Sequence, residues 1–371
     1  MKEDSPVRLG IDGRELSVGV RTGIGRYVAA VVEGARRDGV EVIVYSDLAL
    51  PKLETLEGVT VRIMPGGPTV WWDQVRLPRQ LARDGVSVFL SPYYKGPLVS
   101  PCPVVLTIHD LLFIGYLGRT RPVYDRVMTW LARLYTSRAA AIITDSEHAR
   151  RTIVARLGIA ADRVTVIPLA VGAEFRPVPF DEQVGRHYGV RQPYVLYVGN
   201  FLPHKNLIRL VQAFAGLPEA VRRDCSLVLA GNDAGWREAV LGEARRLGVE
   251  QRVVVTGVVA GADLPVLYAG CEVFAMPSLD EGFGLPAAEA MACGAPVIAS
   301  ERASLPEVTG DAALLVDPSR AEAIGAALAS VLSDRERREE LRARSLKRAE
   351  AFRGDRSVRQ VLALVRAVEK G

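Results

Sequence analysis

The feature that most constrains this chain is an alternation of short, β-branched apolar runs with longer amphipathic stretches. Apolar strands that are buried on both faces and alternate with helices are typical of a doubly wound parallel sheet. Amphipathic stretches at 27–37 and 123–138 fit the helices of such a fold. In the first half of the chain we predict strands at 7–12, 40–45, 86–90, 104–108, 141–144 and 164–167.

The alternation stops over residues 168–193, which hold four prolines and show little periodicity. This composition predicts an interdomain linker, part of which is open to a short helix. The pattern then resumes, and it ends with a charged helical run at 333–348 and a last helix at 357–368. The strands predicted in the second half are 194–198, 227–230, 253–256, 273–276, 296–299 and 314–316.

A chain of 371 residues is long enough for two domains of roughly 100–200 residues each. We therefore expect an α/β protein with two Rossmann-like domains, 1–172 and 173–355, that face each other across a cleft. Ligands of such sheets bind beyond the carboxyl ends of the strands.

Composition and charge exclude several other classes of protein. Lys and Arg outnumber Asp and Glu by 47 to 43, and a net charge of +4 is too small to indicate nucleic-acid binding. No run of about 18 apolar residues predicts a membrane-spanning helix. The acidic N-terminus is not followed by the apolar segment of a signal peptide, and the cysteines lack zinc-site spacing. We therefore expect a reduced, cytoplasmic protein.

Polar residues and glycines follow four predicted strands of the second half. They are Gly199-Asn200, Gly231-Asn232-Asp233, Gly257 and the segment 277–284. One such strand end is an ordinary turn, but four of them in one domain predict a rim that faces a ligand.

The most informative segment of this rim is 277–296. Gly282 and Gly284 allow a ligand to approach the backbone at the start of a helix, where free N–H groups bind anions. Glu281 and Glu289 flank this helix start, and carboxylates are good acceptors for sugar hydroxyls. The combination predicts a sugar-nucleotide site, although a plain turn with a solvated Glu289 fits the same residues.

Lys205 adds a mobile cation for a diphosphate. No Asp-x-Asp pair occurs in the sequence, so the metal–diphosphate clamp that such a pair provides has no candidate. We expect protein groups, without a metal ion, to meet the charge of the leaving group.

Two segments of the first half also fit a site. The stretch 22–27 opens a helix, and its Gly23 and Gly25 suit phosphate binding through backbone N–H groups or a flexible loop. His109 and Asp110 end a strongly apolar strand, where they either enter a site or make structural hydrogen bonds. Two other histidines, His148 and His187, are expected at the surface.

Together these residues resemble glycosyltransferase family 4, and within it the bacterial mannosyltransferase-like group that builds surface polysaccharides. The similarity covers nearly the whole chain in the order of the family, and 277–318 is its most specific part. The matching stretches are TGIGRY (22–27), LTIHDLLF (106–113), AIITDSEHARRTI (141–153), YVLYVGNFLPHKNL (194–207), LVLAG (227–231), VVVTG (253–257), PSLDEGFGLPAAEAMACGAPVIAS (277–300) and SLPEVTGDAALLVDP (304–318).

The resemblance implies a GT-B fold and retaining hexosyl transfer from a nucleotide-sugar, with no metal and no cofactor. It favours GDP-mannose over a UDP-sugar as the donor, and a glycan or a lipid-linked saccharide as the acceptor. It also implies that the last helix, 356–371, crosses back onto the first domain.

The resemblance further implies roles for individual residues. His109, Glu281 and Lys205 are the expected catalytic residues, and Asp110 is expected on the acceptor side. The expected donor-binding residues are Gly23, Gly25, Asn200, Lys205, Val258, Glu281, Gly282, Phe283, Gly284, Leu285 and Glu289.

The chain departs from the pattern of the family at three positions. Asn200 and His204 stand where many members have arginine, so Lys205 is expected to meet more of the phosphate charge than usual. Gly354 stands where tryptophan is frequent near the crossover. Three other functions fit the same fold: a sugar-nucleotide epimerase, a glycan phosphorylase with pyridoxal phosphate, and a non-catalytic nucleotide-sugar-binding protein.

Residues 118–138 raise a separate question about the membrane. Val127, Trp130, Leu131 and Leu134 form an apolar stripe, and Arg119, Arg121, Arg126, Arg133 and Arg138 outnumber the single Asp125. A basic amphipathic helix of this kind suits reversible contact with the anionic inner face of a membrane. Alternatively, the stripe packs on the sheet of its own domain.

Overall fold

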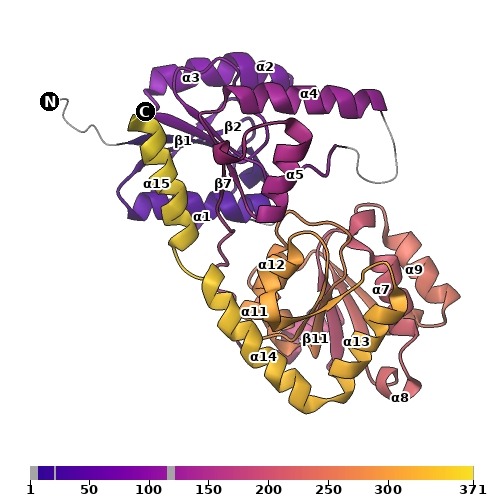
Figure 1. Cartoon of the computed structure of the whole chain (residues 1–371). Coiled ribbons are helices and arrows are strands. Elements are labelled where there is room, and N and C mark those ends of the chain that lie inside the picture. The colour runs from indigo at the N-terminus through magenta and orange to yellow at the C-terminus, as the bar shows by residue number, and fades with distance from the viewer. Residues whose placement is uncertain (1–6, 21, 115–121, 371) are drawn as a thin grey trace. The chain divides into compact units, whose positions relative to one another are not determined.

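The computed structural model describes residues 7–20, 22–114 and 122–370, and the chain forms two compact units. The first unit comprises Met1–Ala170 and Gly354–Gly371, and the second comprises Val171–Arg353 (Figure 1). Each unit is built on one parallel sheet, and all strand pairs in both sheets are parallel. The prediction of two Rossmann-like α/β halves is therefore confirmed.

The sheet of the first unit has seven strands in the order β3-β2-β1-β4-β5-β6-β7. Its strands are β1 (Arg8–Asp12), β2 (Glu41–Ser46), β3 (Thr60–Ile63), β4 (Val88–Ser91), β5 (Val104–Thr107), β6 (Ala141–Thr144) and β7 (Val164–Val166). Its helices are α1 (Gly23–Arg37), α2 (Thr69–Trp71), α3 (Leu77–Asp84), α4 (Pro122–Arg138), α5 (Glu147–Leu157) and α15 (Arg356–Lys370).

The two faces of this sheet pack into separate hydrophobic cores. Val42 and Val44 of β2 lie in the core under α1 and α15, whereas Ile43 and Tyr45 lie in the core on the side of α3, α4 and α5. This alternation follows from the two-residue period of a strand. It explains why consecutive residues of these strands are apolar.

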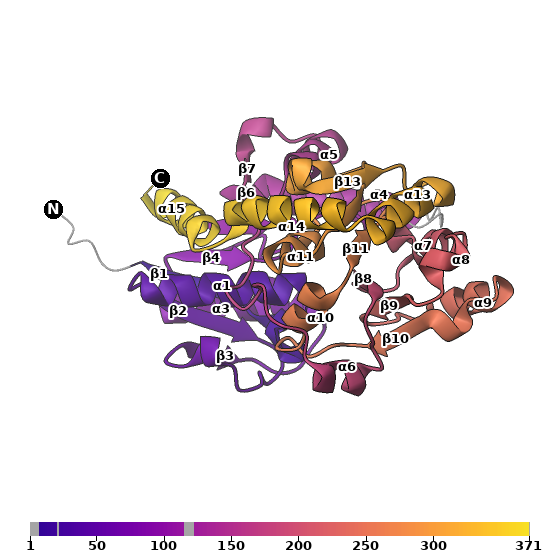
Figure 2. The ribbon, with the colours of Figure 1, turned by 90° about the horizontal axis from the view of Figure 1, so that it is seen from below.

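The last helix, α15, packs against α1 of the first unit (Figures 1 and 2). A Cβ atom on Gly34 of α1 would lie 2.2 Å from Cγ1 of Val358, so the absence of a side chain at position 34 permits the close approach of α15. An ion pair between Arg37 and Asp355, 2.7 Å between Nη2 and Oδ1, lies beside this contact.

The sheet of the second unit has six strands in the order β10-β9-β8-β11-β12-β13. Its strands are β8 (Tyr194–Val198), β9 (Ser226–Ala230), β10 (Val253–Gly257), β11 (Val273–Met276), β12 (Val297–Ser300) and β13 (Ala313–Val316). Its helices are α6 (Glu182–Tyr188), α7 (Leu207–Ala215), α8 (Glu219–Arg222), α9 (Arg237–Arg246), α10 (Leu264–Gly270), α11 (Leu285–Ala292), α12 (Leu305–Thr309), α13 (Ala321–Ser333) and α14 (Arg335–Ala349).

Strand order reverses at one place in each sheet. In the first unit the reversal lies between β1 and β4, and in the second it lies between β8 and β11. Ligands of doubly wound sheets bind at such switch points, beyond the carboxyl ends of the strands. The segments that follow these four strands are therefore the candidate ligand-binding segments.

Candidate functional site

Lys205 and Glu281 meet at the switch point of the second unit. Lys205 follows β8 and Glu281 follows β11, and Nζ of Lys205 lies 2.7 and 2.9 Å from the two carboxylate oxygens. The two side chains are 16 % and 8 % exposed, so the pair is mostly shielded from solvent. The structure thus brings together two residues that the sequence separates by 76 positions.

Asn206 holds the segment that carries Lys205. Its Nδ2 donates to the carbonyl oxygens of Pro277 and Pro318 at 2.9 and 2.7 Å, and its backbone is left-handed with φ of 64°. The first of these bonds joins the segment after β8 to the segment after β11. Sequence reasoning missed this positioning role, because an asparagine in a polar turn gives no signal for its distant partners.

The turn before α11 presents its backbone N–H groups without a side-chain cap. Gly284 is the N-cap residue, with φ of 96°. Ser304 Oγ donates to the carbonyls of Glu281 and Phe283 at 3.0 and 2.8 Å and so fixes the turn. The structure gives the amides of Phe283, Gly284 and Leu285 no acceptor among the described residues. A helix start of this kind suits an anion such as phosphate.

Glu289 is 1 % exposed and lies inside α11. One of its carboxylate oxygens accepts a hydrogen bond of 3.0 Å from the hydroxyl of Tyr268. The solvated position that the sequence left open for Glu289 is therefore wrong. Its role toward ribose hydroxyls stays a prediction.

Three glycines at the carboxyl edge of the second sheet lie against one another. The amide of Gly199 donates to Ala230 and the amide of Gly231 donates to Gly257, at 2.9 and 2.8 Å. A Cβ atom on Gly231 would lie 2.1 Å from the carbonyl oxygen of Gly199. A side chain at position 231 would therefore block this close approach, whereas Asn200 and Val258 nearby are exposed to solvent.

His204 does not replace the positive charge of the arginine that is frequent at its position. The side chain is 5 % exposed, and burial together with the charge of Lys205 lowers the pKa of His204 to about 4. A neutral His204 leaves Lys205 as the cation of this segment.

The first turn of α1 carries Gly23 and Gly25. Thr22 Oγ1 caps this turn by accepting from the amide of Gly25 at 2.9 Å, and Gly25 itself is buried. The flexible loop that the sequence left open is therefore a capped helix start. The amides of Gly23 and Ile24 precede the capped one and suit an anion.

His109 is joined to Asp145 by a short hydrogen bond. The two residues follow the neighbouring strands β5 and β6, and Nδ1 of His109 lies 2.6 Å from Oδ2 of Asp145. Asp145 is 2 % exposed. The other ring nitrogen of His109, Nε2, has no hydrogen-bond partner among the described residues, and the ring packs edge-on against Tyr27 at 5.3 Å.

Two effects oppose each other at the imidazole. Burial disfavours the cation, but the charge and hydrogen bond of Asp145 outweigh burial and raise the pKa of His109 above its usual value. When the imidazole is protonated it donates from both nitrogens. Nδ1 then serves Asp145, and the buried Nε2 has no acceptor among the described residues. Sequence reasoning missed Asp145, although it ends a predicted strand in the same way as His109.

Asp110 caps the turn that follows His109. Its Oδ1 accepts from the amide of Leu112 at 3.0 Å. This is one of the two roles that the sequence allowed, and the acceptor-side role of Asp110 stays a prediction. His187 is exposed as expected, whereas His148 is half-buried.

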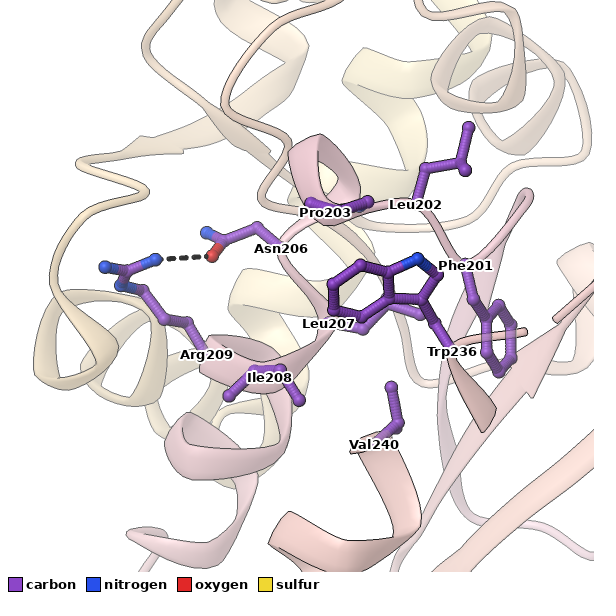
Figure 3. A pocket seen from close by; sticks show the side chains of 9 residues that line it. All are labelled: Phe201, Leu202, Pro203, Asn206, Leu207, Ile208, Arg209, Trp236 and Val240. Carbon is purple, nitrogen blue, oxygen red and sulfur yellow. Dashed lines mark hydrogen bonds between the residues drawn. The ribbon is translucent and has the colours of Figure 1, made fainter. Parts of the chain in front are cut away.

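A cavity of about 140 Å³ lies beside the segment that carries Lys205. Trp236, Val240, Leu207 and Ile208 are among the residues that line it (Figure 3). Arg209 contributes the single charged lining side chain, and it donates to Asn206 Oδ1 at 3.0 Å. The lining includes none of the predicted donor-binding residues, and it is mostly apolar.

The described residues include no group of three or more His, Cys, Asp or Glu side chains that could hold a metal ion. All four cysteines are buried and free. Across residues 7–20, 22–114 and 122–370, no helix is both long and apolar enough to span a bilayer.

Comparisons with known proteins match both halves of the chain. Residues 186–348 match the family model "Glycosyl transferases group 1", and residues 21–175 match "Glycosyltransferase Family 4". The O-antigen chain mannosyltransferase B of Escherichia coli is 37 % identical over 267 residues, which are 70 % of this chain and 68 % of that protein.

Two further proteins are similar over different extents. The serotype-specific mannosyltransferase WbdA of Escherichia coli is 32 % identical over 68 % of this chain, but the match spans only 32 % of WbdA. The Anabaena protein HepE, solved in complex with UDP and glucose, superposes with a TM-score of 0.78 at 18 % identity, covering 98 % of this chain and 100 % of HepE.

Proposed function

Because the chain belongs to the group 1, family 4 glycosyltransferases, we propose that it transfers a mannosyl group from GDP-mannose with retention at the anomeric carbon. The proposed acceptor is a glycan or a lipid-linked saccharide in surface polysaccharide synthesis. The mannosyltransferase names of two relatives support the sugar. The observation that carries the proposal is the Lys205–Glu281 pair beside the uncapped amides before α11.

The second unit supplies groups for both parts of a nucleotide-sugar. The amides of Phe283, Gly284 and Leu285 and the ammonium of Lys205 would stabilise the departing diphosphate, which gains charge as the bond to the sugar breaks. Glu281 would accept hydrogen bonds from sugar hydroxyls and orient Lys205. His109 of the first unit, held by Asp145, would donate from Nε2 to an oxygen of the donor sugar.

Retention without a carboxylate nucleophile requires attack on the face that the diphosphate leaves. The bond from the anomeric carbon to the diphosphate oxygen breaks, and the acceptor hydroxyl forms the new bond. The proton of that hydroxyl passes to the leaving phosphate oxygen. The protein positions the reactants and stabilises charge in this scheme.

Metal independence is part of the proposal, because Lys205 and backbone amides would stabilise the negative charge of the diphosphate in place of a metal ion. The test is transfer in excess EDTA. Activity should survive, and loss of most activity that Mg²⁺ or Mn²⁺ restores would refute this part.

The alternative donor is a UDP-sugar, which the complex of HepE with UDP favours. A thermal-shift panel of GDP, UDP, GDP-mannose and UDP-glucose separates the two donors. A ligand present at 100 times its Kd stabilises the protein by about 2.7 kcal/mol. Stabilisation by the UDP ligands alone would select the alternative.

Product analysis with donor alone tests for an epimerase, and binding without turnover would indicate a non-catalytic protein.

We also propose that α4 contacts the anionic inner face of a membrane reversibly. The alternative, in which its apolar stripe packs on the sheet, is wrong for Val127 and Trp130, which are 49 % and 61 % exposed. The small side chains of Ala132 and Thr136 are the buried ones on this helix. Leu131 and Leu134 of the stripe are half-buried.

The exposed face of α4 is larger than the sequence indicated. Val123 is 70 % exposed and lies four residues before Val127, so it shares a face with Val127 and Trp130. Arg126 and Arg133 are exposed on the same helix, where each donates to a backbone carbonyl at 3.1 Å, Arg126 to Pro122 and Arg133 to Arg156. Arg119 and Arg121 lie outside the described residues. Apolar side chains beside exposed arginines suit anionic lipid.

Co-sedimentation with vesicles that contain phosphatidylglycerol tests this contact. Binding should be strong at low salt, and Val127→Ser with Trp130→Ser should weaken it at least tenfold. Trp236→Ser is the matched control, because Trp236 is a 41 % exposed tryptophan of the other unit. Equal binding by the double variant and the control would rule out this surface.

A further inference from the structure

A second polar cluster lies at the switch point of the first unit, and the donor site does not use it. Asp12 ends β1, and Arg14 follows two residues later. Lys95 follows β4, the strand beside β1. His109 and Asp145 follow β5 and β6, the next strands of the same sheet. Because parallel strands end at a common edge, the cluster and the His109–Asp145 pair lie on the same edge of this unit.

The cluster is an extended ion network. Arg14 binds both carboxylate oxygens of Asp12, with Nε at 3.0 Å and Nη2 at 2.6 Å. Nη2 of Arg14 also lies 2.8 Å from Asp73, and Nζ of Lys95 lies 3.2 Å from the same carboxylate. Asp12 and Asp73 are 1 % and 3 % exposed. Buried ion pairs are weak evidence for stability because desolvation offsets the attraction, so net stabilisation alone is a poor explanation for a network of this size.

An unusual backbone conformation brings Asp73 into the network. Trp72–Arg76 is a π-helical turn, and single turns of this type occur frequently at functional sites. Gln74 of the same turn donates to Gly96 at 3.0 Å and accepts from Leu98 at 2.9 Å, which ties the turn to the segment that carries Lys95. The Arg14 guanidinium stacks on Trp72 at 4.1 Å.

Tyr93 and Glu15 link this network to the start of α1, because the Arg14 guanidinium lies 5.9 Å from the centre of the Tyr93 ring. The Glu15 carboxylate accepts from the hydroxyl of Tyr93 at 3.0 Å and from Thr22, the cap of α1, at 2.7 Å. Glu15 and Tyr93 are half-buried, and the Lys95 side chain is 24 % exposed. These three side chains are therefore the part of the network that a ligand can reach.

The charges of the cluster define the ligand that it suits. Three carboxylates, those of Asp12, Asp73 and Glu15, stand against the two cations Arg14 and Lys95, so no surplus positive charge is available for a phosphate. Carboxylates accept hydrogen bonds from sugar hydroxyls, an ammonium donates to sugar oxygens, and a tyrosine ring packs on the apolar face of a sugar. The set matches an uncharged polyol.

We propose that Glu15, Tyr93 and Lys95 bind the terminal, uncharged sugar residue of the acceptor and exclude acceptors that carry a phosphate at this residue. The inference rests on the proposed function, because it assigns the acceptor of the same transfer. Arg14 and Asp73 act as positioning residues, which hold Lys95 and the aromatic rings in place.

Saturation-transfer NMR on the full chain, with and without GDP, tests the proposal. Methyl α-mannoside should show transfer from the protein, and its 6-phosphate should bind at least tenfold more weakly. Glu15→Gln and Lys95→Met should each weaken binding of methyl α-mannoside at least tenfold, and in Lys95→Met the Kd for GDP should stay unchanged. Glu54→Gln, at an exposed carboxylate of the same unit, is the matched control.

Two results would overturn the proposal: equal binding of the neutral and phosphorylated sugars, or undiminished binding in both cluster variants. Absence of saturation transfer to wild-type protein in both conditions would also overturn it. These outcomes are distinct from failure of the proposed function, which would appear as no binding of any nucleotide or nucleotide-sugar in the thermal-shift panel.

Discussion

Replacing Asp145 with asparagine should impair sugar transfer through His109. Asparagine keeps the shape of the side chain but removes the charge that faces Nδ1 of His109 at 2.6 Å. Two unit charges about 4 Å apart interact by roughly 4 kcal/mol at an effective dielectric constant near 20, and desolvation offsets part of this. A hydrogen bond to a charged group contributes about 1.5–3 kcal/mol net. At about 1.36 kcal/mol per factor of ten, we expect kcat/KM to fall roughly 10- to 100-fold.

The raised pKa of His109 also predicts the direction in which the pH–rate profile of the variant should move. In the wild-type protein the folded pKa of His109 is raised above its ordinary value of 6.5. The stability from this pair is therefore fully present below about pH 6.5 and is lost as the pH rises through the folded pKa. In Asp145→Asn burial remains without the opposing charge, so the pKa of His109 should fall. The alkaline limb of the pH–rate profile should move to lower pH.

The assay is the initial rate of GDP release from GDP-mannose with methyl α-mannoside as acceptor, measured across pH 5.5–9. Asp162→Asn, at an exposed aspartate of the same unit, is the control. Because Asp145 acts through His109, the double variant with His109→Ala should lose no more activity than His109→Ala alone. Additive losses, an unmoved pH profile, or equal losses in transfer and GDP affinity would refute the reasoning.

Three further predictions concern the second unit. Lys205→Ala and Glu281→Gln should each lower kcat/KM about 100-fold, and near-normal rates in both would show that the donor pocket is misassigned. Asn206→Ala removes two buried hydrogen bonds, so urea unfolding should show a loss of about 2–3 kcal/mol, and an unchanged midpoint would contradict this. Gly284→Ala would place Cβ 2.5 Å from Cδ2 of Leu305 at a φ of 96°; we expect it to cost about 1–3 kcal/mol and to weaken GDP binding, whereas full stability would show that the turn relaxes freely.

The sequence by itself determined the fold class. β-Branched runs that are apolar on both faces identify parallel strands, and twelve of these runs became strands of the two sheets with small shifts at their ends. The missed strand is β3, Thr60–Ile63, which lies at the edge of the first sheet. None of its residues is buried. Its side chains therefore need not be apolar on both faces of the sheet, and the apolar run used to predict the other strands is missing.

The sequence also determined which side chains bear the chemistry of the second unit. Glycines, carboxylates and a lysine after apolar strands indicate a rim because parallel strands end at one edge. The order of strands within the sheet is not written in any local pattern. Only the tertiary structure placed β8 beside β11 and so brought Lys205 to Glu281.

Two features of the first unit, the partner of His109 and the buried face of α4, were determined by the tertiary structure alone. Asp145 became the partner of His109 because β5 and β6 are neighbours, a long-range pairing that residue type does not encode. In α4 the helical period predicts an apolar stripe but not the direction in which it faces. The small Ala132 and Thr136 permit close packing, so the helix buries them and leaves Val127 and Trp130 toward solvent.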